Sequence, residues 1–272
     1  EKEREDEKRF KDEPEIKGFI FFDYECMVGE FHEPNLIIAE QICMDCINEK
    51  GSNCLGTCGV RSFKKNNVFC RWLIDQENHI AMAHNMKAYD RHFIMNFLIT
   101  DRLPSDRMHN ILVNQAKILQ IKVNKVNIID SYNFIPFALS KFPKAFELNE
   151  MAKGYFPHLF NTRENQNKVF STHPDINFYQ DKYMKCEERE KFRNWYALNQ
   201  NKRFDLKHEL YKYCESDVDT LKRGVLTFRK LFIGLTNVDP FKKSITIASL
   251  CQLVFRTLFM KPDTIPLIQD SG

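Results

Sequence analysis

The sequence lacks a long hydrophobic run. Its longest apolar stretches extend over about ten residues, whereas a helix needs about 20 apolar residues to span a bilayer. No signal-peptide pattern precedes the first apolar segment, and the first residue is not Met. Internal repeats are absent, and so are low-complexity tracts beyond the charged start. These absences argue against a membrane protein and a secreted protein, and we expect a fragment of a longer intracellular one.

The charge is not of one sign either. The chain has 40 Lys and Arg against 37 Asp and Glu, a net charge of +3. Residues 1–15 hold 8 acids and 5 bases, and the remainder carries a net charge of +6. This mildly basic balance is compatible with binding to nucleic acid. We expect residues 1–16 to form a charged, disordered tail.

Nine cysteines without a secretory signal favour a reducing compartment and argue against a disulfide framework. Residues 43–58 place four of them in a C-x2-C-x7-C-x3-C pattern. Four thiolates around a tetrahedral Zn²⁺ would hold together a hairpin too short to be stable alone, and free buried cysteines are the alternative. A redox pair is not favoured, because no βαβ pattern surrounds the motif. The candidate zinc ligands are Cys43, Cys46, Cys54 and Cys58, while Cys26, Cys70 and Cys251 are expected as small core residues.

The apolar pattern predicts an α/β fold. Early extended segments followed by helices favour a sheet that is covered by helices. The segment 140–230 is expected to be mostly helical, with a polar loop at 161–180. The expected strands are 17–28, 35–43, 60–63 and 79–85, with a hairpin formed by 117–123 and 126–131, and the expected helices are 67–75 (with Val68, Trp72 and Leu73 on one face), 88–100, 208–232 and 244–259.

Acidic residues stand where a buried strand would normally have none. In "GFIFFDYECMV" (18–28), strand alternation places Asp23 and Glu25 on the same face. Burying a carboxylate without compensation costs on the order of several kcal/mol. A nearby cation would offset this cost. Asp90 opens a later helix, and Asp217 follows Tyr213 by one helical turn, so these two side chains point the same way. Taken singly, each has a plainer interpretation: an edge strand, a helix N-terminal charge favoured by the dipole, and an incidental pair.

The order of these patterns is more informative than each alone. D-x-E after an apolar run, then N-x4-D, then Y-x3-D resembles the three motifs of DEDD exonucleases in their tyrosine variant. Longer strings, among them "IDSYNFIPFALSKFPKAFEL" (129–148) and "KGYFPHLFN" (153–161), resemble the protein-primed family B DNA polymerases of Maverick/Polinton transposons and related viruses. The resemblance extends from about residue 17 to 268.

This resemblance implies an architecture. The fold would be ribonuclease H-like, with a mixed central sheet flanked by helices and a small Cys-rich zinc hairpin. Residues 17–235 would form a 3′→5′ exonuclease domain into which the hairpin 43–58 is inserted. Residues 236–272 would be the helical start of a region that leads to a polymerase module, which this chain does not contain.

The resemblance also assigns roles at the site. A tyrosine, Tyr213, would orient the attacking water, and Lys153 would stabilise the scissile phosphate. Two Mg²⁺ or Mn²⁺ ions would lower the pKa of the water and neutralise charge on the leaving 3′ oxygen. The four carboxylates that would hold these ions are Asp23, Glu25, Asp90 and Asp217.

The same comparison places four residues at the DNA. Asn85 and Ser131 occupy positions that hold single-stranded DNA, and Tyr89 stands where an aromatic ring packs on the terminal nucleotide. Tyr132 departs from the pattern, since this position is usually Leu, but an aromatic ring could still stack on a base.

The expected activity is removal of 5′-mononucleotides from single-stranded DNA 3′ ends, as the proofreading part of a polymerase or as a stand-alone remnant. A polymerase module or other replication proteins are the expected partners, without a membrane, in the nucleus or at a viral replication site. Two alternatives stay open: a non-catalytic nucleic-acid-binding or scaffold module, and an RNA exonuclease on the same scaffold.

Overall fold

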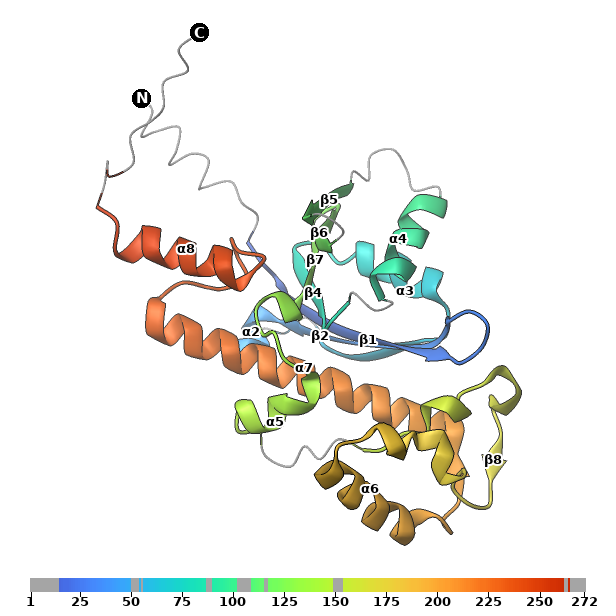
Figure 1. Cartoon of the computed structure of the whole chain (residues 1–272). Helices are drawn as coiled ribbons and strands as arrows, with labels where there is room; N and C mark the ends of the chain where they lie inside the picture. The colour runs from blue at the N-terminus through green and yellow to red at the C-terminus, as the bar shows by residue number, and fades with distance from the viewer. Residues whose placement is uncertain are drawn as a thin grey trace.

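A mixed β-sheet forms the centre of the molecule (Figure 1). The computed structural model describes residues 15–49, 54, 56–86, 90–101, 109–114, 117–148, 154–261 and 264. The strand order is β3-β2-β1-β4-β7-β6-β5, in which β1, β4 and β7 run parallel and the other neighbours pair antiparallel. The strands are β1 (Gly18–Met27), β2 (Glu33–Cys43), β3 (Gly59–Phe63), β4 (His79–Ala83), β5 (His109–Asn114), β6 (Lys117–Val123) and β7 (Val126–Asp130).

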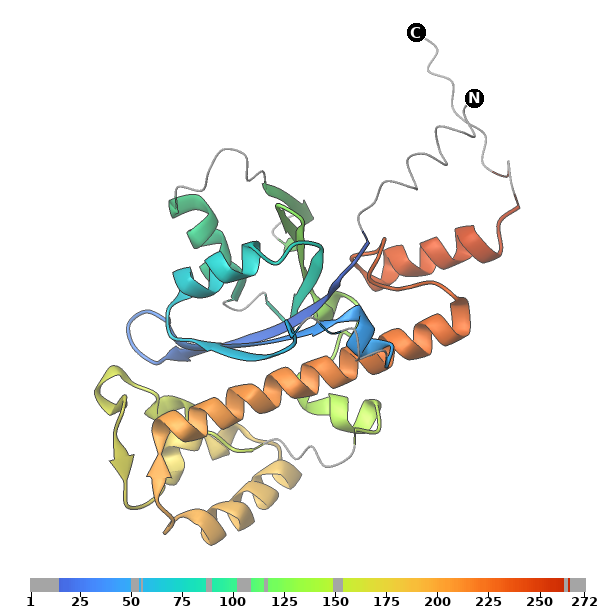
Figure 2. The same ribbon diagram turned by 180° about the vertical axis from the view of Figure 1, so that it is seen from behind.

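Helices cover both faces of this sheet (Figures 1 and 2). The alternation of β1 explains the two layers, because successive side chains point to opposite faces. Ile20 and Phe22 pack with α3 (Asn66–Ile74) and α4 (Asp90–Thr100). Phe19 and Phe21 pack instead with α7 (Leu206–Thr236), a helix of 31 residues that crosses the other face. The candidate acids of β1 therefore lie on the α7 side.

Close packing fixes α7 against its neighbours. A Cβ atom added at Gly224 would lie 2.2 Å from the ring of Phe142, which belongs to α5 (Phe142–Ala145). Farther along, Arg229 pairs with Asp239 at 2.6 Å and lies over the ring of Phe19. Helix α8 (Ile247–Leu258) follows and has a capping box at its start. Among the residues described, no helix is both long and apolar enough to cross a membrane.

The segment before α7 packs against the β1–β2 hairpin. Val28 donates its backbone N–H to the Asn161 carbonyl oxygen at 2.8 Å, and the Asn161 side chain donates back to the Cys26 carbonyl oxygen at 2.9 Å. The remaining elements are α2 (Met44–Ile47), α6 (Cys186–Asn199), the two-stranded sheet of β8 (Val169–Phe170) and β9 (Phe204–Asp205), and the 3-10 turns Ser131–Asn133, Leu139–Lys141, His158–Phe160, Arg163–Asn165, Ile176–Tyr179 and Asp181–Tyr183.

The predicted α/β class, with a mixed sheet and flanking helices, is confirmed. Three details of the prediction are wrong. Helix α3 buries Phe69 and Cys70 with Leu73, while Val68 is exposed, because the sheet covers the neighbouring stripe. The span 140–230 contains less helix than expected, since 3-10 turns and β8–β9 interrupt it. Cys251 is exposed on α8 rather than in the core. Of the predicted tail, residues 1–14 lie outside the described residues.

Candidate functional site

Polar side chains gather where the three parallel strands end. β1 carries Asp23 and Glu25 in its second half, β4 is followed by Asn85, and β7 ends at Asp130 and is followed by Tyr132. Because β1, β4 and β7 run parallel, their carboxyl ends meet at the same edge of the sheet. In open α/β sheets, ligands bind outside these carboxyl ends.

A cavity of about 410 Å³ opens at this edge. Four residues that the sequence motifs singled out line it together, although they come from β1, from the ends of β4 and β7, and from α7. The full lining is Asp23, His84, Asn85, Tyr132, Ala138, Leu139, Asp217 and Leu221. A larger hollow of about 760 Å³ along β2, β3 and the start of α7 contains none of the residues that the motifs singled out.

Glu25 lies beside Asp23 and is almost completely buried, with 7% of its surface exposed. Donor atoms of Asp23, Glu25 and the Cys214 thiol all lie within 4.8 Å of one another. Burial raises the pKa of the Cys214 thiol well above its usual range, and the charges of Asp23, Glu25 and Asp217 raise it further. The charges of all three carboxylates therefore act on this buried thiol of α7, and carboxylate oxygens are the ligands that Mg²⁺ and Mn²⁺ prefer.

Asp90, the first residue of α4, is buried and does not line the cavity. Burial raises its pKa to about 7, and the neighbouring Asp130 carboxylate contributes to the shift. Burial raises the pKa of the Cys26 thiol to about 12, and the charges of Asp90, Glu25 and Asp23 contribute to the shift. The charge of Asp90 thus acts on the same thiol as the two acids of β1.

Asp130 was not identified from the sequence. Its Oδ1 atom accepts hydrogen bonds from the backbone N–H groups of Asn85 (2.8 Å) and Tyr132 (2.9 Å). The carboxylate thereby joins the ends of β4 and β7 and fixes two residues that line the cavity, with Asn85 held at a positive φ of 61°. An acid as the last residue of a buried strand is the signal that could have indicated this role.

His84 and Ser131 form a second connection between the same strand ends. The Ser131 hydroxyl lies 2.9 Å from both the Ala83 carbonyl oxygen and His84 Nδ1, and His84 Nε2 lies 2.9 Å from the Phe137 carbonyl oxygen. Burial lowers the pKa of His84, which favours the neutral ring. Ser131 is 1% exposed and does not line the cavity, so in this structure its side chain positions His84.

Tyr213 packs against two rings of the segment "GYFPHLFN" (154–161). Its ring centroid lies 5.5 Å from that of Phe156 and 5.1 Å from that of His158. These contacts limit the orientations open to the phenol, one turn before Asp217 on α7. Two further predicted site residues, Tyr89 and Lys153, lie outside the described residues.

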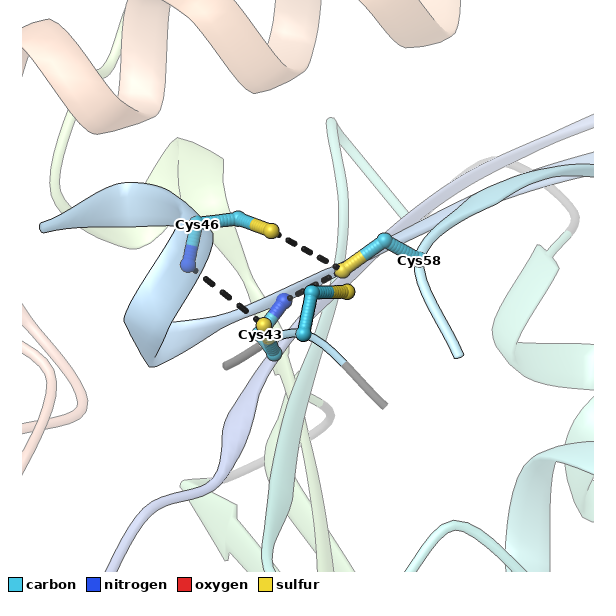
Figure 3. Close-up of side chains that lie close together, drawn as sticks. Cys43, Cys46 and Cys58 are labelled. Carbon is cyan, nitrogen blue, oxygen red and sulfur yellow. Dashed lines mark hydrogen bonds between the residues drawn. The ribbon is translucent and has the colours of Figure 1, made fainter. Parts of the chain in front are cut away.

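The four cysteines of residues 43–58 come together between the end of β2 and the start of β3 (Figure 3). All four are free thiols, and their sulfur atoms lie within 4.8 Å of one another. The backbone N–H of Cys43 donates to Cys58 Sγ at 3.1 Å, that of Cys46 donates to Cys43 Sγ at 3.4 Å, and Cys58 Sγ lies 3.7 Å from Cys46 Sγ. Backbone N–H groups aimed at sulfur favour thiolates, so this donor set fits Zn²⁺.

The thiols of this cluster differ in acidity. A hydrogen bond from the Gly56 backbone N–H lowers the pKa of Cys54 to about 7, while a hydrogen bond with Cys43 raises the pKa of Cys46. A cation would favour the thiolate at all four positions, because metal binding displaces the protons.

Comparison with known proteins identifies relatives of the chain. Residues 70–271 match the family described as "DNA polymerase type B, organellar and viral". A probable DNA polymerase of Neurospora intermedia is 27% identical over 204 residues, which is 71% of this chain and 20% of that protein. A probable DNA polymerase of Podospora anserina is 28% identical over 149 residues, 55% of this chain and 12% of that protein. The chain thus spans a fifth or less of the length of these curated relatives.

The fold is also similar to part of a solved polymerase. Phi29 DNA polymerase in a ternary complex with primer-template DNA and incoming nucleotide matches with a TM-score of 0.54 and 14% identity, over 90% of this chain and 35% of that one. The same polymerase complexed with single-stranded DNA matches with a TM-score of 0.51. At this identity the likeness concerns the fold, whereas the family match covers most of the chain. The chain therefore belongs to the type B DNA polymerases of organelles and viruses.

Proposed function

We propose that this chain is a metal-dependent 3′→5′ exonuclease that removes nucleoside 5′-monophosphates from single-stranded DNA 3′ ends. The observation that carries the proposal is the cavity at the carboxyl ends of the parallel strands. Asp23 and Asp217 line it together with Asn85, and Glu25 lies beside Asp23. Paired carboxylates in a hollow that can admit a strand end are the donor set that phosphodiester hydrolysis with divalent cations needs.

The residues present fit Mg²⁺ or Mn²⁺ as cofactors. Asp23, Glu25 and Asp217 supply carboxylate oxygens, and Asp90 is the fourth proposed ligand. A cation nearby would favour the charged form of Asp90, against the burial that raises its pKa to about 7. Two bound cations would supply activation of a water and neutralisation of the charge on the leaving oxygen.

The side chains around the cavity have distinct proposed tasks. Tyr213 orients the attacking water by a hydrogen bond, since a phenol is too weak a base at neutral pH to take its proton. The rings of Phe156 and His158 hold it in place for this purpose. Asn85 offers an amide to the DNA backbone, and Tyr132 offers a ring on which an unpaired base can stack. The roles of Lys153 at the phosphate and of Tyr89 at the terminal nucleotide stay predictions.

Single-stranded DNA is the proposed substrate for two reasons. Stacking on an aromatic ring requires an unpaired base. In addition, a polymerase of similar fold has been observed in complex with single-stranded DNA. Because the curated relatives are several times longer than the matched region, a polymerase module is the proposed partner, and proofreading is the proposed role. Descent from a Maverick/Polinton-type element stays a prediction.

A nuclease assay tests the activity directly. The whole chain is incubated with a single-stranded DNA labelled near its 5′ end, with Mg²⁺ or Mn²⁺, beside the variants Asp23→Ala and Asp101→Ala. Asp101 forms an ion pair with the exposed Arg71 and neither residue lines the cavity, so its loss should leave activity unchanged. We expect stepwise shortening by the wild type and Asp101→Ala, and none by Asp23→Ala. Absence of shortening by the wild type, or equal shortening by all three, would support the non-catalytic alternative.

A matched RNA strand distinguishes the remaining alternative. We expect the DNA strand to be shortened faster than RNA of the same sequence. Faster shortening of RNA would identify an RNA exonuclease on the same scaffold, since 2′-hydroxyl contacts decide this preference.

We also propose that the cysteine cluster binds one structural Zn²⁺. The convergence of four free sulfur atoms from two strand ends supports a tetrahedral, closed site. Its role is to hold the ends of β2 and β3 together rather than to take part in the reaction. Elemental analysis of the purified chain should give one zinc per chain, reduced to a trace in Cys46→Ser.

A further inference from the structure

A thiol lies within the carboxylate cluster. Cys214 follows Tyr213 on α7, and its side chain is fully buried against β1, where its sulfur lies 3.7 Å from the Asp23 carbonyl oxygen. Its sulfur and one carboxylate oxygen each from Asp23 and Glu25 lie within 4.8 Å of one another. The proposed reaction gives this sulfur no task, because Mg²⁺ and Mn²⁺ take oxygen ligands.

The chemistry of the three donors differs from that of an acidic patch. One sulfur and two carboxylate oxygens form a mixed set, and Glu25 and Cys214 are both more than nine-tenths buried. Open zinc sites in proteins have three protein donors and leave a fourth position to water or substrate. Soft or borderline cations such as Cd²⁺ and Zn²⁺ accept thiolate sulfur, which hard cations do not.

We propose that Asp23, Glu25 and Cys214 form a mixed sulfur–oxygen site for a thiophilic divalent cation of the Zn²⁺ or Cd²⁺ kind, which overlaps the proposed Mg²⁺ or Mn²⁺ site. The regulatory consequence rests on the proposed function: a cation at this site occupies two carboxylates that the exonuclease needs for Mg²⁺ or Mn²⁺. Zn²⁺ also binds most oxygen and nitrogen sites more tightly than Mn²⁺ does, and the sulfur strengthens this preference. Zn²⁺, the cation proposed to stabilise the cysteine cluster, should therefore inhibit the exonuclease activity when it binds the mixed site.

Cys26 provides a matched comparison within the same neighbourhood. It follows Glu25 directly on β1, and its thiol also feels the charges of Asp23, Glu25 and Asp90. Its sulfur does not belong to the group of mutually close donors. The register of the β1–β2 pairing shifts between Glu25 and Cys26, so the regular strand alternation is interrupted at Cys26. Proximity to the acids is thus shared by both thiols, but the donor geometry is specific to Cys214.

Metal binding, rather than activity, tests the inference. The whole chain, loaded with zinc at its cysteine cluster, is titrated with Cd²⁺, and the Cd–thiolate ultraviolet absorbance is followed in the wild type, Cys214→Ser and Cys26→Ser. Replacement of Zn²⁺ by Cd²⁺ at the cysteine cluster occurs in all three proteins. It therefore cancels when the absorbance of each variant is subtracted from that of the wild type. Losing a partner that only orients a ligand weakens metal binding about 10- to 100-fold, so losing Cys214 should weaken the additional Cd²⁺ site at least tenfold. Cys26→Ser should match the wild type, and Cd²⁺ should displace Mn²⁺, as measured by the electron paramagnetic resonance of free Mn²⁺.

Two outcomes would overturn the inference: an unchanged Cd²⁺ affinity in Cys214→Ser, or an equal loss in Cys26→Ser. If Cys214→Ser does not fold by circular dichroism, Cys214→Ala serves instead, because it also removes the sulfur but places no hydroxyl in the core, and it should weaken the same Cd²⁺ site. The readout separates this inference from the proposed function. A chain without nuclease activity that binds Cd²⁺ through Cys214 contradicts only the activity, whereas an active nuclease whose Cd²⁺ binding ignores Cys214 contradicts only the mixed site.

Discussion

The two candidate metal-binding clusters are assembled in opposite ways. The cysteine cluster draws all its donors from residues 43–58, where β2 ends and β3 begins. The carboxylate cluster takes Asp23 and Glu25 from β1 and Asp217 from the distant helix α7, and it lies where both pack in the core. The first cluster can form as soon as a short hairpin closes, whereas the second exists only after the sheet and α7 have assembled.

This difference determines what each cation would do. The cysteines are only partly buried and belong to a short connection, so a bound Zn²⁺ would act as a cross-link that stabilises the fold. The carboxylates are positioned by strands and a helix that the hydrophobic core already holds. The cations proposed for this cluster would therefore not be needed for folding and would be available for chemistry. Metal removal should consequently affect stability at one cluster and activity at the other.

The largest expected change in stability follows from breaking the cysteine cluster. Cys46→Ser should lower the free energy of unfolding by about 3 kcal/mol, because a cation that binds only the folded chain stabilises it by about that much at about 100 times its Kd. Urea denaturation of the zinc-loaded proteins measures the change. Cys251→Ser, at an exposed position on α8, should leave stability and zinc content unchanged. An equal urea midpoint and equal zinc content in Cys46→Ser would show that the cluster is not a structural zinc site.

The same contrast explains how far the sequence predicts each cluster. The spacing of the cysteines was enough to suggest that their sulfur atoms lie together, since the chain itself brings neighbouring donors close, and the structure confirms this convergence. The acids were visible one by one as charges in apolar contexts, but their convergence was inferred from a family resemblance. Asp130 and Cys214 escaped notice for a physical reason. Their positions depend on the pairing of Ala83 with Asp130 between β4 and β7, and on which stripe of α7 faces β1.

Helix α3 shows the limit of periodicity within a single element. Three- and four-residue spacing is satisfied by the stripe that contains Val68 as well as by the stripe that contains Phe69, and only contact with the sheet selects the second. The hairpin of β6 and β7 was better predicted, because alternation and the turn at Asn124, with its positive φ of 52°, specify it locally. Local patterns thus determined the elements, and tertiary packing determined their faces.

An intermediate effect is expected at Gly224, where α7 is placed over the sheet. Gly224→Ala would bring a methyl group within 2.2 Å of the buried Phe142 ring, and such overpacking costs about 1–3 kcal/mol. Gly234→Ala on the same helix meets no atom within 4 Å and should stabilise by up to about 1 kcal/mol through helix propensity. Thermal unfolding measures both changes.

The Gly224 variant also sharpens the comparison between the clusters. A displaced α7 should lower nuclease activity, because Asp217 moves with it, while the zinc content stays at the wild-type value. Reduced zinc content together with normal activity would mean that the packing of α7 stabilises the cysteine cluster rather than the carboxylate cluster.

The smallest expected effect is a change in pH dependence at the cysteine end of the sheet. His79 lines a hollow together with Cys43 and Gln41. Its Nδ1 lies 3.0 Å from the Glu77 carbonyl oxygen and its Nε2 lies 3.1 Å from Gln41 Nε2, an arrangement that suits a neutral ring. Burial lowers the pKa of His79, and the charge of Lys17 acts in the same direction.

As the pH falls below about 6.5, the unfolded chain therefore takes up a proton at His79 before the folded chain does, and the free energy of unfolding decreases. His79→Gln keeps a polar side chain beside Gln41 and removes this titration. Urea denaturation at about pH 7.5 and about pH 5.5 should show a smaller loss of stability in the variant than in the wild type. Identical pH slopes in the two proteins would mean that His79 does not contribute, and that the acid sensitivity of the fold arises elsewhere, for example at the buried His84.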